Sequence, residues 1–119
     1  MRERYAWYHV DILVNNAGIL LALPYDHSPA DRVDDILAVN LRAPVALIQA
    51  FAPGMVQWHA GRIITVASLA GQIGHPDIWY GITKAGVMNT TKSFAKLLVS
   101  RVNTGGKAAY LLPGTAPIS

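Results

Sequence analysis

Three short apolar runs in this sequence have the composition of buried parallel strands. The first, 10–14, is aliphatic and largely β-branched and runs directly into two asparagines and a glycine. The second is 62–66 and the third is 107–112. Apolar runs of this length, bounded by turn residues, are typical of strands buried in a parallel sheet. We therefore predict a sheet of about three parallel strands.

Between these runs, apolar residues recur at helical spacing. A first helix is predicted with Ser28 as its N-cap, Pro29 in its first position and Asp31 in the capping-box position. Asn40 interrupts the pattern, and a second helical stretch follows over about 43–58. These features predict two helices in series between the first and second strands.

A third helix is predicted over about 78–100, where an apolar stripe is broad enough to pack on a sheet. Gly61 is predicted to end the helix before the second strand, and 71–79 is predicted to be a loop. Alternating strands and helices indicate an α/β fold. The whole chain, 1–119, is predicted to form one unit.

Composition narrows the class of protein. The chain is 52% hydrophobic and 14% charged, which indicates a globular unit without disordered segments. The net charge is +3, but lysine and arginine are scattered along the sequence, so nucleic-acid binding has little support. The absence of cysteine excludes disulfides and thiolate metal sites, and no metal site is predicted.

The sequence also bears on localisation. Residues 1–8 lack the apolar core of a signal peptide, and no later run is predicted to be long enough to cross a membrane. The lack of cysteine is compatible with the cytoplasm. We therefore expect a cytoplasmic protein.

Candidate chemistry is concentrated in residues 68–84. Tyr80 and Lys84 are four residues apart on a predicted helix, so their side chains share one face. A positive charge beside a phenol favours the phenolate, which makes the pair usable in proton transfer. Ser68 follows the second predicted strand, where its hydroxyl can reach the same cleft. Alone, such a pair is more often a solvated helix face and such a serine a cap, but their combination is rarer.

The order of these motifs resembles the short-chain dehydrogenase/reductase family. Asn-Asn-Ala-Gly (15–18) follows the first strand, Ser68 the second, and Tyr-Gly-Ile-Thr-Lys (80–84) opens the third helix. Asn40 matches the family's fourth active-site residue, and the resemblance extends over about 10–114. It implies a partial Rossmann-like, doubly wound parallel sheet. It also implies that the catalytic residues are Asn40, Ser68, Tyr80 and Lys84.

The resemblance further implies an NAD- or NADP-dependent oxidoreductase that interconverts an alcohol and a ketone by hydride transfer, with Tyr80 as general acid or base. The implied residues at the cofactor are Asn16, Ala17, Gly18, Tyr80, Lys84, Pro113 and Gly114. Family members commonly dimerise through the helices that correspond here to 43–58 and 78–100, so a homo-oligomer is expected. His75, Ile78 and Trp79 are candidates for the substrate wall, although a packing role is favoured for the histidine.

One part of the family pattern is missing. No G-x-G-x-x-G or comparable glycine-rich turn follows a strand in this sequence, so the phosphate cradle of a dinucleotide fold is absent. We therefore expect the N-terminal nucleotide-binding half of the fold to be missing. A truncated, non-catalytic remnant that keeps only a helical interaction surface remains an alternative. A non-enzymatic regulator would predict damaged active-site residues, and all four are intact.

Overall fold

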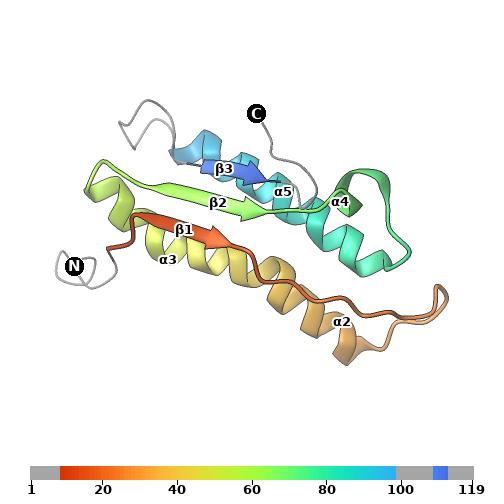
Figure 1. Ribbon diagram of the computed structural model, residues 1–119. Helices are drawn as coiled ribbons and strands as arrows, with labels where there is room; N and C mark the ends of the chain where they lie inside the picture. The colour runs from red at the N-terminus through yellow and green to blue at the C-terminus, as the bar shows by residue number, and fades with distance from the viewer. Residues whose placement is uncertain (1–8, 99–108, 113–119) are drawn as a thin grey trace.

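The computed structural model describes residues 9–98 and 109–112 of the 119-residue chain. Three strands form one parallel sheet in the spatial order β1-β2-β3 (Figure 1). Their bounds are Ile12–Asn15 for β1, Arg62–Val66 for β2 and Ala109–Leu112 for β3. The predicted α/β architecture with a three-stranded parallel sheet is confirmed.

The register of the sheet shows why the first strand differs from its prediction. Ile12 pairs with Arg62 and Asn15 with Thr65, while the Arg62 amide donates to the carbonyl oxygen of Asp11. The first strand therefore begins two residues later than its apolar run and extends into the first asparagine. Hydrogen bonding to the neighbouring strand sets these bounds, and the residue types of the run alone do not reveal where that bonding begins and ends.

Two helical connections link the strands. Between β1 and β2 lie α2 (Ala30–Leu37), the π-helical segment η1 (Ala38–Arg42) and α3 (Ala43–Gln57). Between β2 and β3 lie the short α4 (Ala70–Ile73) and the long α5 (Ile78–Leu98). The predicted interruption at Asn40 is thus a π-turn within a continuous helix. The helix α4, within a segment predicted to be a loop, has only four residues and is too short to show a periodic pattern.

The predicted N-cap of the first helix is wrong. Pro29, and not Ser28, is the N-cap of α2, and no side chain there bonds a free backbone amide. The Ser28 hydroxyl instead accepts a hydrogen bond from the indole N–H of Trp79, at 3.1 Å. At the other end α3 stops at Gln57, before Gly61, and His59 takes a left-handed conformation (φ 55°). A contact distant in sequence has displaced a local capping signal.

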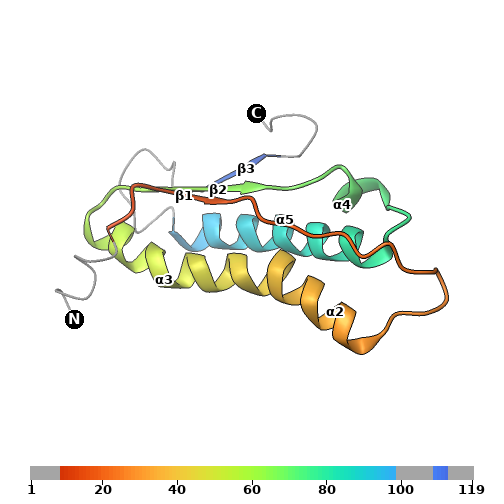
Figure 2. The same ribbon diagram turned by 60° about the horizontal axis from the view of Figure 1, so that its bottom comes forward.

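The helices α3 and α5 lie against one face of the sheet, and α2 lies on the same side, beyond the ends of the strands (Figure 2). A core cluster of buried residues joins that face to α3; its members are Leu13, Ile48, Ala52, Met55 and Ile63. On the opposite face, Ile12 and Val14 are 53% and 52% exposed. None of the elements in the described ranges covers these two side chains. The described part of the fold is therefore wound on one side only.

The prediction that no run is long enough to cross a membrane is wrong. The continuous helical run Ala30–Gln57, of 28 residues, is long and apolar enough to cross a membrane by those two criteria alone. Core helices of soluble proteins meet the same criteria, and this run contributes Ile48, Ala52 and Met55 to the core described above. The run is therefore weak evidence for a membrane span.

Candidate active site

A cavity of about 390 Å³ opens where β1 and β2 end. Its lining residues are Asn16, Gly18, Leu20, Val66, Ala67, Ser68, Tyr80 and Lys84. Parallel strands direct the residues that follow them to one edge of the sheet, and ligands of open α/β sheets bind at that edge. The structure thus brings together five of the predicted site residues. Ala17, also predicted, is exposed and does not line the cavity.

Lys84 is the charged group of this cavity. It is only 5% exposed, and burial lowers the pKa of its ammonium from the ordinary 10.5. Its Nζ donates to the carbonyl oxygen of Val66 at 3.3 Å. A Cβ on Gly18 would lie 3.2 Å from Nζ, so the glycine lets the β1 loop come close to the lysine. Val66 is its acceptor within the described part of the chain, which leaves two donors of the ammonium for a bound molecule.

Tyr80 stands one helical turn before Lys84 on α5, as the spacing predicts. The Lys84 Nζ lies 5.6 Å from the centroid of the Tyr80 ring, on its face. The lysine thus lies over the face of the ring, a position from which its charge can reach the phenol only through space. The tyrosine is half-buried, and its ring lines the same cavity as Ser68.

Ser68 has two functions available to it. Its Oγ accepts a hydrogen bond from the amide of Ala70 at 3.1 Å, so it supports the turn into α4. The accepting oxygen keeps its own O–H as a donor, and the residue lines the cavity. The serine therefore serves as a turn residue before α4, and this role does not remove its hydroxyl from the cavity.

Asn40 is buried within the π-turn η1, with 1% of its surface exposed. Its Oδ1 accepts from the Ile19 amide at 2.8 Å. Its Nδ2 donates to the Ile19 carbonyl at 3.0 Å and to the Thr83 hydroxyl at 3.3 Å. The amide side chain thus fixes the loop after β1 to α5, one residue before Lys84. π-turns are frequent at functional sites, and this one directs Asn40 inward.

The comparison with known families decides how this geometry is classified. The family model described as short chain dehydrogenase matches residues 2–106. The chain belongs to this family. The resemblance drawn from the sequence motifs is thereby confirmed.

Curated proteins with similar sequences include 3-oxoacyl-[acyl-carrier-protein] reductases and a nodulation protein. The 3-oxoacyl-[acyl-carrier-protein] reductase of Staphylococcus aureus (strain N315) is 39% identical over 93 residues, which are 77% of this chain and 38% of that protein. The nodulation protein G of Rhizobium meliloti is 41% identical over 93 residues, with the same coverage of each chain. The chain therefore spans about two fifths of the length of these relatives.

Solved structures of short-chain dehydrogenases give the same result. A proposed NAD(P)-dependent gluconate 5-dehydrogenase from Beutenbergia cavernae, with bound NADP, superposes with a TM-score of 0.79 at 31% identity. That match covers 91% of this chain and 41% of the other. A metagenomic short-chain oxidoreductase in complex with NADP gives a TM-score of 0.76, also at 31% identity, over 92% of this chain and 52% of that one.

Asp77, which lines a second cavity, is a buried carboxylate that was not among the predicted residues. It is 8% exposed, and its carboxylate accepts from the amides of Leu21 (2.6 Å), Ala22 (3.2 Å) and Tyr80 (3.2 Å). Burial acts to raise the pKa of Asp77, but these hydrogen bonds and the nearby His75 outweigh it and lower that pKa below 3.8. The signal in the sequence was an aspartate three residues before Tyr80, the spacing of an N-cap.

One of the three residues predicted as candidates for the substrate wall lines a cavity in the described part of the chain. His75 lines a second cavity next to the first, and its Nδ1 accepts from the Asp77 amide at 2.9 Å. Trp79 is tied to Ser28 and lines neither of the two cavities, and neither does Ile78. Pro113 and Gly114 lie outside the described residues. The described ranges contain no group of three histidine, cysteine or acidic side chains that could hold a metal ion.

Lys84→Met is expected to raise the free energy of unfolding at neutral pH by roughly 0.5–2 kcal/mol, because it removes a charge that burial penalises. Burial lowers the pKa of the folded lysine, so the penalty is complete below that pKa. It disappears as the pH rises toward the unfolded value of 10.5. Urea unfolding at neutral pH and at about pH 10 measures the difference. The exposed Lys92→Met is the control, and a Lys84→Met protein less stable than wild type at neutral pH would contradict this account.

Proposed function

We propose that this chain is the catalytic segment of an NAD(P)-dependent oxidoreductase that interconverts an alcohol and a ketone by hydride transfer. The observation that carries the proposal is a buried lysine with donors to spare, beside a tyrosine and a serine hydroxyl in one cavity. The family membership supports it, as do the two NADP-bound structures that the chain resembles.

We propose that this cavity holds the ribose and nicotinamide portion of NAD or NADP. The Lys84 ammonium has two donors for ribose hydroxyls, and Gly18 leaves room beside it. Asn16 lines the same cavity, and Ala17 lies between the two in sequence. We assign Pro113 and Gly114 to the nicotinamide side from the family pattern. When bound, the cofactor supplies or accepts the hydride.

In this proposal the proton is handled by three side chains. Tyr80 gives its phenolic proton to the substrate oxygen during ketone reduction and takes it back during alcohol oxidation. Lys84 stabilises the phenolate electrostatically from the face of the ring. Ser68 donates a hydrogen bond to the same substrate oxygen, where negative charge develops. Asn40 holds the loop and helix that carry the proton path and, by family analogy, a relay water.

The surroundings of the enzyme are part of the proposal. Leu47 on α3 and Ile82 on α5 are 40% and 48% exposed, which supports a homo-oligomer built through helices 43–58 and 78–100. A small alcohol or ketone is the proposed partner, with no nucleic acid or membrane. The cytoplasm is the proposed location.

One observation favours a second candidate function. The sequence has no glycine-rich phosphate loop, and charge-assisted hydrogen bonds to a phosphate contribute about 1.5–3 kcal/mol each. A chain without these contacts is a non-catalytic remnant if its remaining donors hold the cofactor too weakly. The exposed residues on α3 and α5 would then serve only for association.

Titration calorimetry of the purified 119-residue chain with NAD and with NADP tests the proposal, with circular dichroism to establish folding. Saturable binding followed by ketone-dependent oxidation of the reduced cofactor is the expected result. A folded chain that binds neither dinucleotide would leave the remnant as the better description. A Lys84→Met chain that binds as tightly as wild type would remove the lysine from the cofactor site.

A further inference from the structure

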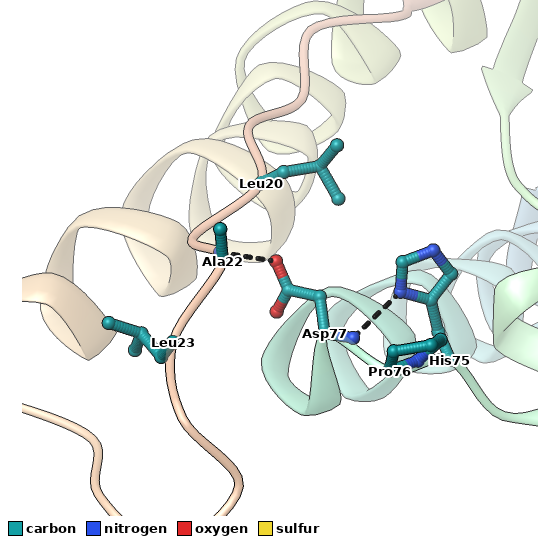
Figure 3. Close-up of a pocket in the computed structure, with 6 residues that line it drawn as sticks. All are labelled: Leu20, Ala22, Leu23, His75, Pro76 and Asp77. Atoms are coloured by element: carbon teal, nitrogen blue, oxygen red, sulfur yellow. Dashed lines mark hydrogen bonds between the residues drawn. The ribbon is translucent and has the colours of Figure 1, made fainter.

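A second cavity of about 390 Å³ adjoins the candidate active site. Figure 3 shows its lining residues, which are Leu20, Ala22, Leu23, His75, Pro76 and Asp77. Leu20 lines both cavities, so a molecule with one end at Tyr80 reaches the second cavity by passing this side chain. The ring of His75, 5.3 Å from the ring of Tyr80 between centroids, lies on the same boundary. One extended molecule can therefore occupy both cavities at once.

Both polar side chains of the second cavity are already engaged. The Asp77 carboxylate accepts three backbone amides, from Leu21 and Ala22 on one loop and from Tyr80 on its own helix. His75 accepts the Asp77 amide at Nδ1, so the proton of its neutral ring is on Nε2. Figure 3 shows the histidine and aspartate bonded in this way. The cavity therefore offers a ligand little more than one imidazole N–H.

The remaining walls are apolar. Leu20, Leu23, Ala22 and Pro76 carry no polar side-chain atom, and Leu20 is 60% exposed. An aliphatic chain that covers them removes apolar surface from water, which is favourable in proportion to the area. A sugar chain would bring several hydroxyls to walls without side-chain partners, and each unpaired group is penalised. The cavity selects an apolar chain over a polyhydroxylated one.

The shape of this cavity is fixed before a ligand arrives. Ala22 has φ 53°, a left-handed conformation that is uncommon for a residue with a Cβ. Its amide and that of Leu21 are both held by Asp77, more than fifty residues away in sequence. The carboxylate thus anchors the wall formed by the 20–23 loop to the start of α5. A preformed pocket saves the entropy that ordering a loop would cost on binding.

Resting on the oxidoreductase function proposed above, we propose that the second cavity binds the aliphatic chain of a ketone or secondary alcohol. The reacting carbon then lies at Tyr80, the chain passes Leu20, and its methylenes contact Leu23 and Pro76. The preferred substrate is a ketone with a chain of several carbons, and a polyhydroxylated ketone is a poor substrate. Asp77 serves as a positioning residue for this cavity and does not touch the reacting atoms.

Two methyl ketones test this assignment by binding alone. Butan-2-one and octan-2-one differ by four methylenes, each of which contributes about fourfold in affinity when fully buried. NMR titration of the 119-residue chain is expected to show octan-2-one binding at least about tenfold more tightly, since burial in an open cavity is partial. Its resonance shifts should map to the amides of Ala22 and Leu23. Equal affinities, or shifts located elsewhere, would overturn the assignment.

Variants of the same loop make the test specific. Leu23→Asp is expected to abolish the preference for octan-2-one, because it places a charge against the methylenes. Tyr25→Asp adds the same charge to an 87% exposed side chain outside the cavity, so the preference should persist. Leu23→Phe fills the cavity without adding a charge. It should weaken the binding of octan-2-one and leave the binding of butan-2-one unchanged. It replaces the aspartate variant if that protein does not fold.

Turnover separates the two proposals. If octan-2-one binds in this cavity and NADPH does not reduce it, the cavity assignment stands and the oxidoreductase function of this chain fails. If both ketones are reduced with equal kcat/KM and Leu23→Asp changes neither value, the function stands and the cavity assignment fails. Reduction with a clear preference for octan-2-one, lost in Leu23→Asp, supports both.

Discussion

Replacing Tyr80 with phenylalanine is expected to lower kcat for ketone reduction about 10²–10⁴-fold, the usual contribution of a positioned proton donor. The ring remains, so its contact with His75 and the cation of Lys84 over its face are retained. The phenolic O–H is the only group lost. The binding affinity for NADP and the melting temperature are therefore expected to stay close to those of wild type.

The measurement is steady-state oxidation of NADPH with a ketone, accompanied by calorimetric titration of the cofactor. Tyr25→Phe removes the hydroxyl from an 87% exposed tyrosine and serves as the matched control. Full activity in the Tyr80→Phe protein would transfer the proton role to another group. A large drop in melting temperature would show instead that the hydroxyl is structural.

The second large effect is expected on stability. Asp77→Asn should lower the free energy of unfolding by about 2–4 kcal/mol, because three backbone amides lose a charged acceptor and hydrogen bonds to charged groups are stronger. The asparagine keeps one oxygen for the two amides of the 20–23 loop, at Leu21 and Ala22. Its NH₂ group then faces the backbone N–H of Tyr80, and because both groups are donors, no hydrogen bond forms there. Urea unfolding followed by circular dichroism measures the change.

The pH dependence of this effect has a definite sign. Burial alone would raise the pKa of Asp77, but its hydrogen bonds and His75 make the folded value lower than the ordinary 3.8. The carboxylate therefore contributes its full stability above 3.8 and loses it as the pH falls through the lower, folded pKa. The difference in stability between wild type and Asp77→Asn is expected to narrow in that acidic range.

Asp26→Asn is the matched control for charge, because Asp26 is exposed on the loop that also carries Tyr25. It is expected to change the free energy of unfolding by no more than about 0.5 kcal/mol at any pH. A difference between wild type and Asp77→Asn that stays constant down to strong acid would show that shape, and not charge, is what the loop requires.

Local pattern was sufficient for much of the fold. The run Arg62–Val66 forms β2 with the predicted bounds, and the position of Asn40 marks the junction of α2 and α3. The strand is visible in the sequence as an unbroken apolar run, and the helix junction as a polar residue on an apolar stripe. Tyr80 and Lys84 were singled out as candidates for the same reason. The spacing of Tyr80 and Lys84 is a local property of one helix.

The features that sequence reasoning missed depend on distant contacts. Ser28 is a good N-cap by type, but its hydroxyl is bonded to Trp79, 51 residues away. Asp77 reaches the loop at Leu21, 56 residues away. No pattern within a helix or strand reports which loop will come to lie beside it. The second cavity lies between the 20–23 loop and residues 75–77, so the spacing of residues within either segment could not predict it.

The π-turn η1 has a consequence for how the gene can vary. A π-turn is an α-helix that holds one extra residue, so loss of a single codon within 38–42 would restore a regular helix. The extra residue is held in one wide turn, so that deletion would leave α2 and α3 on their present faces and would remove only the bulge that carries Asn40. Asn40 could then no longer meet both Ile19 and Thr83. Insertions and deletions in homologues should therefore be rare in this segment and common near the exposed Tyr25.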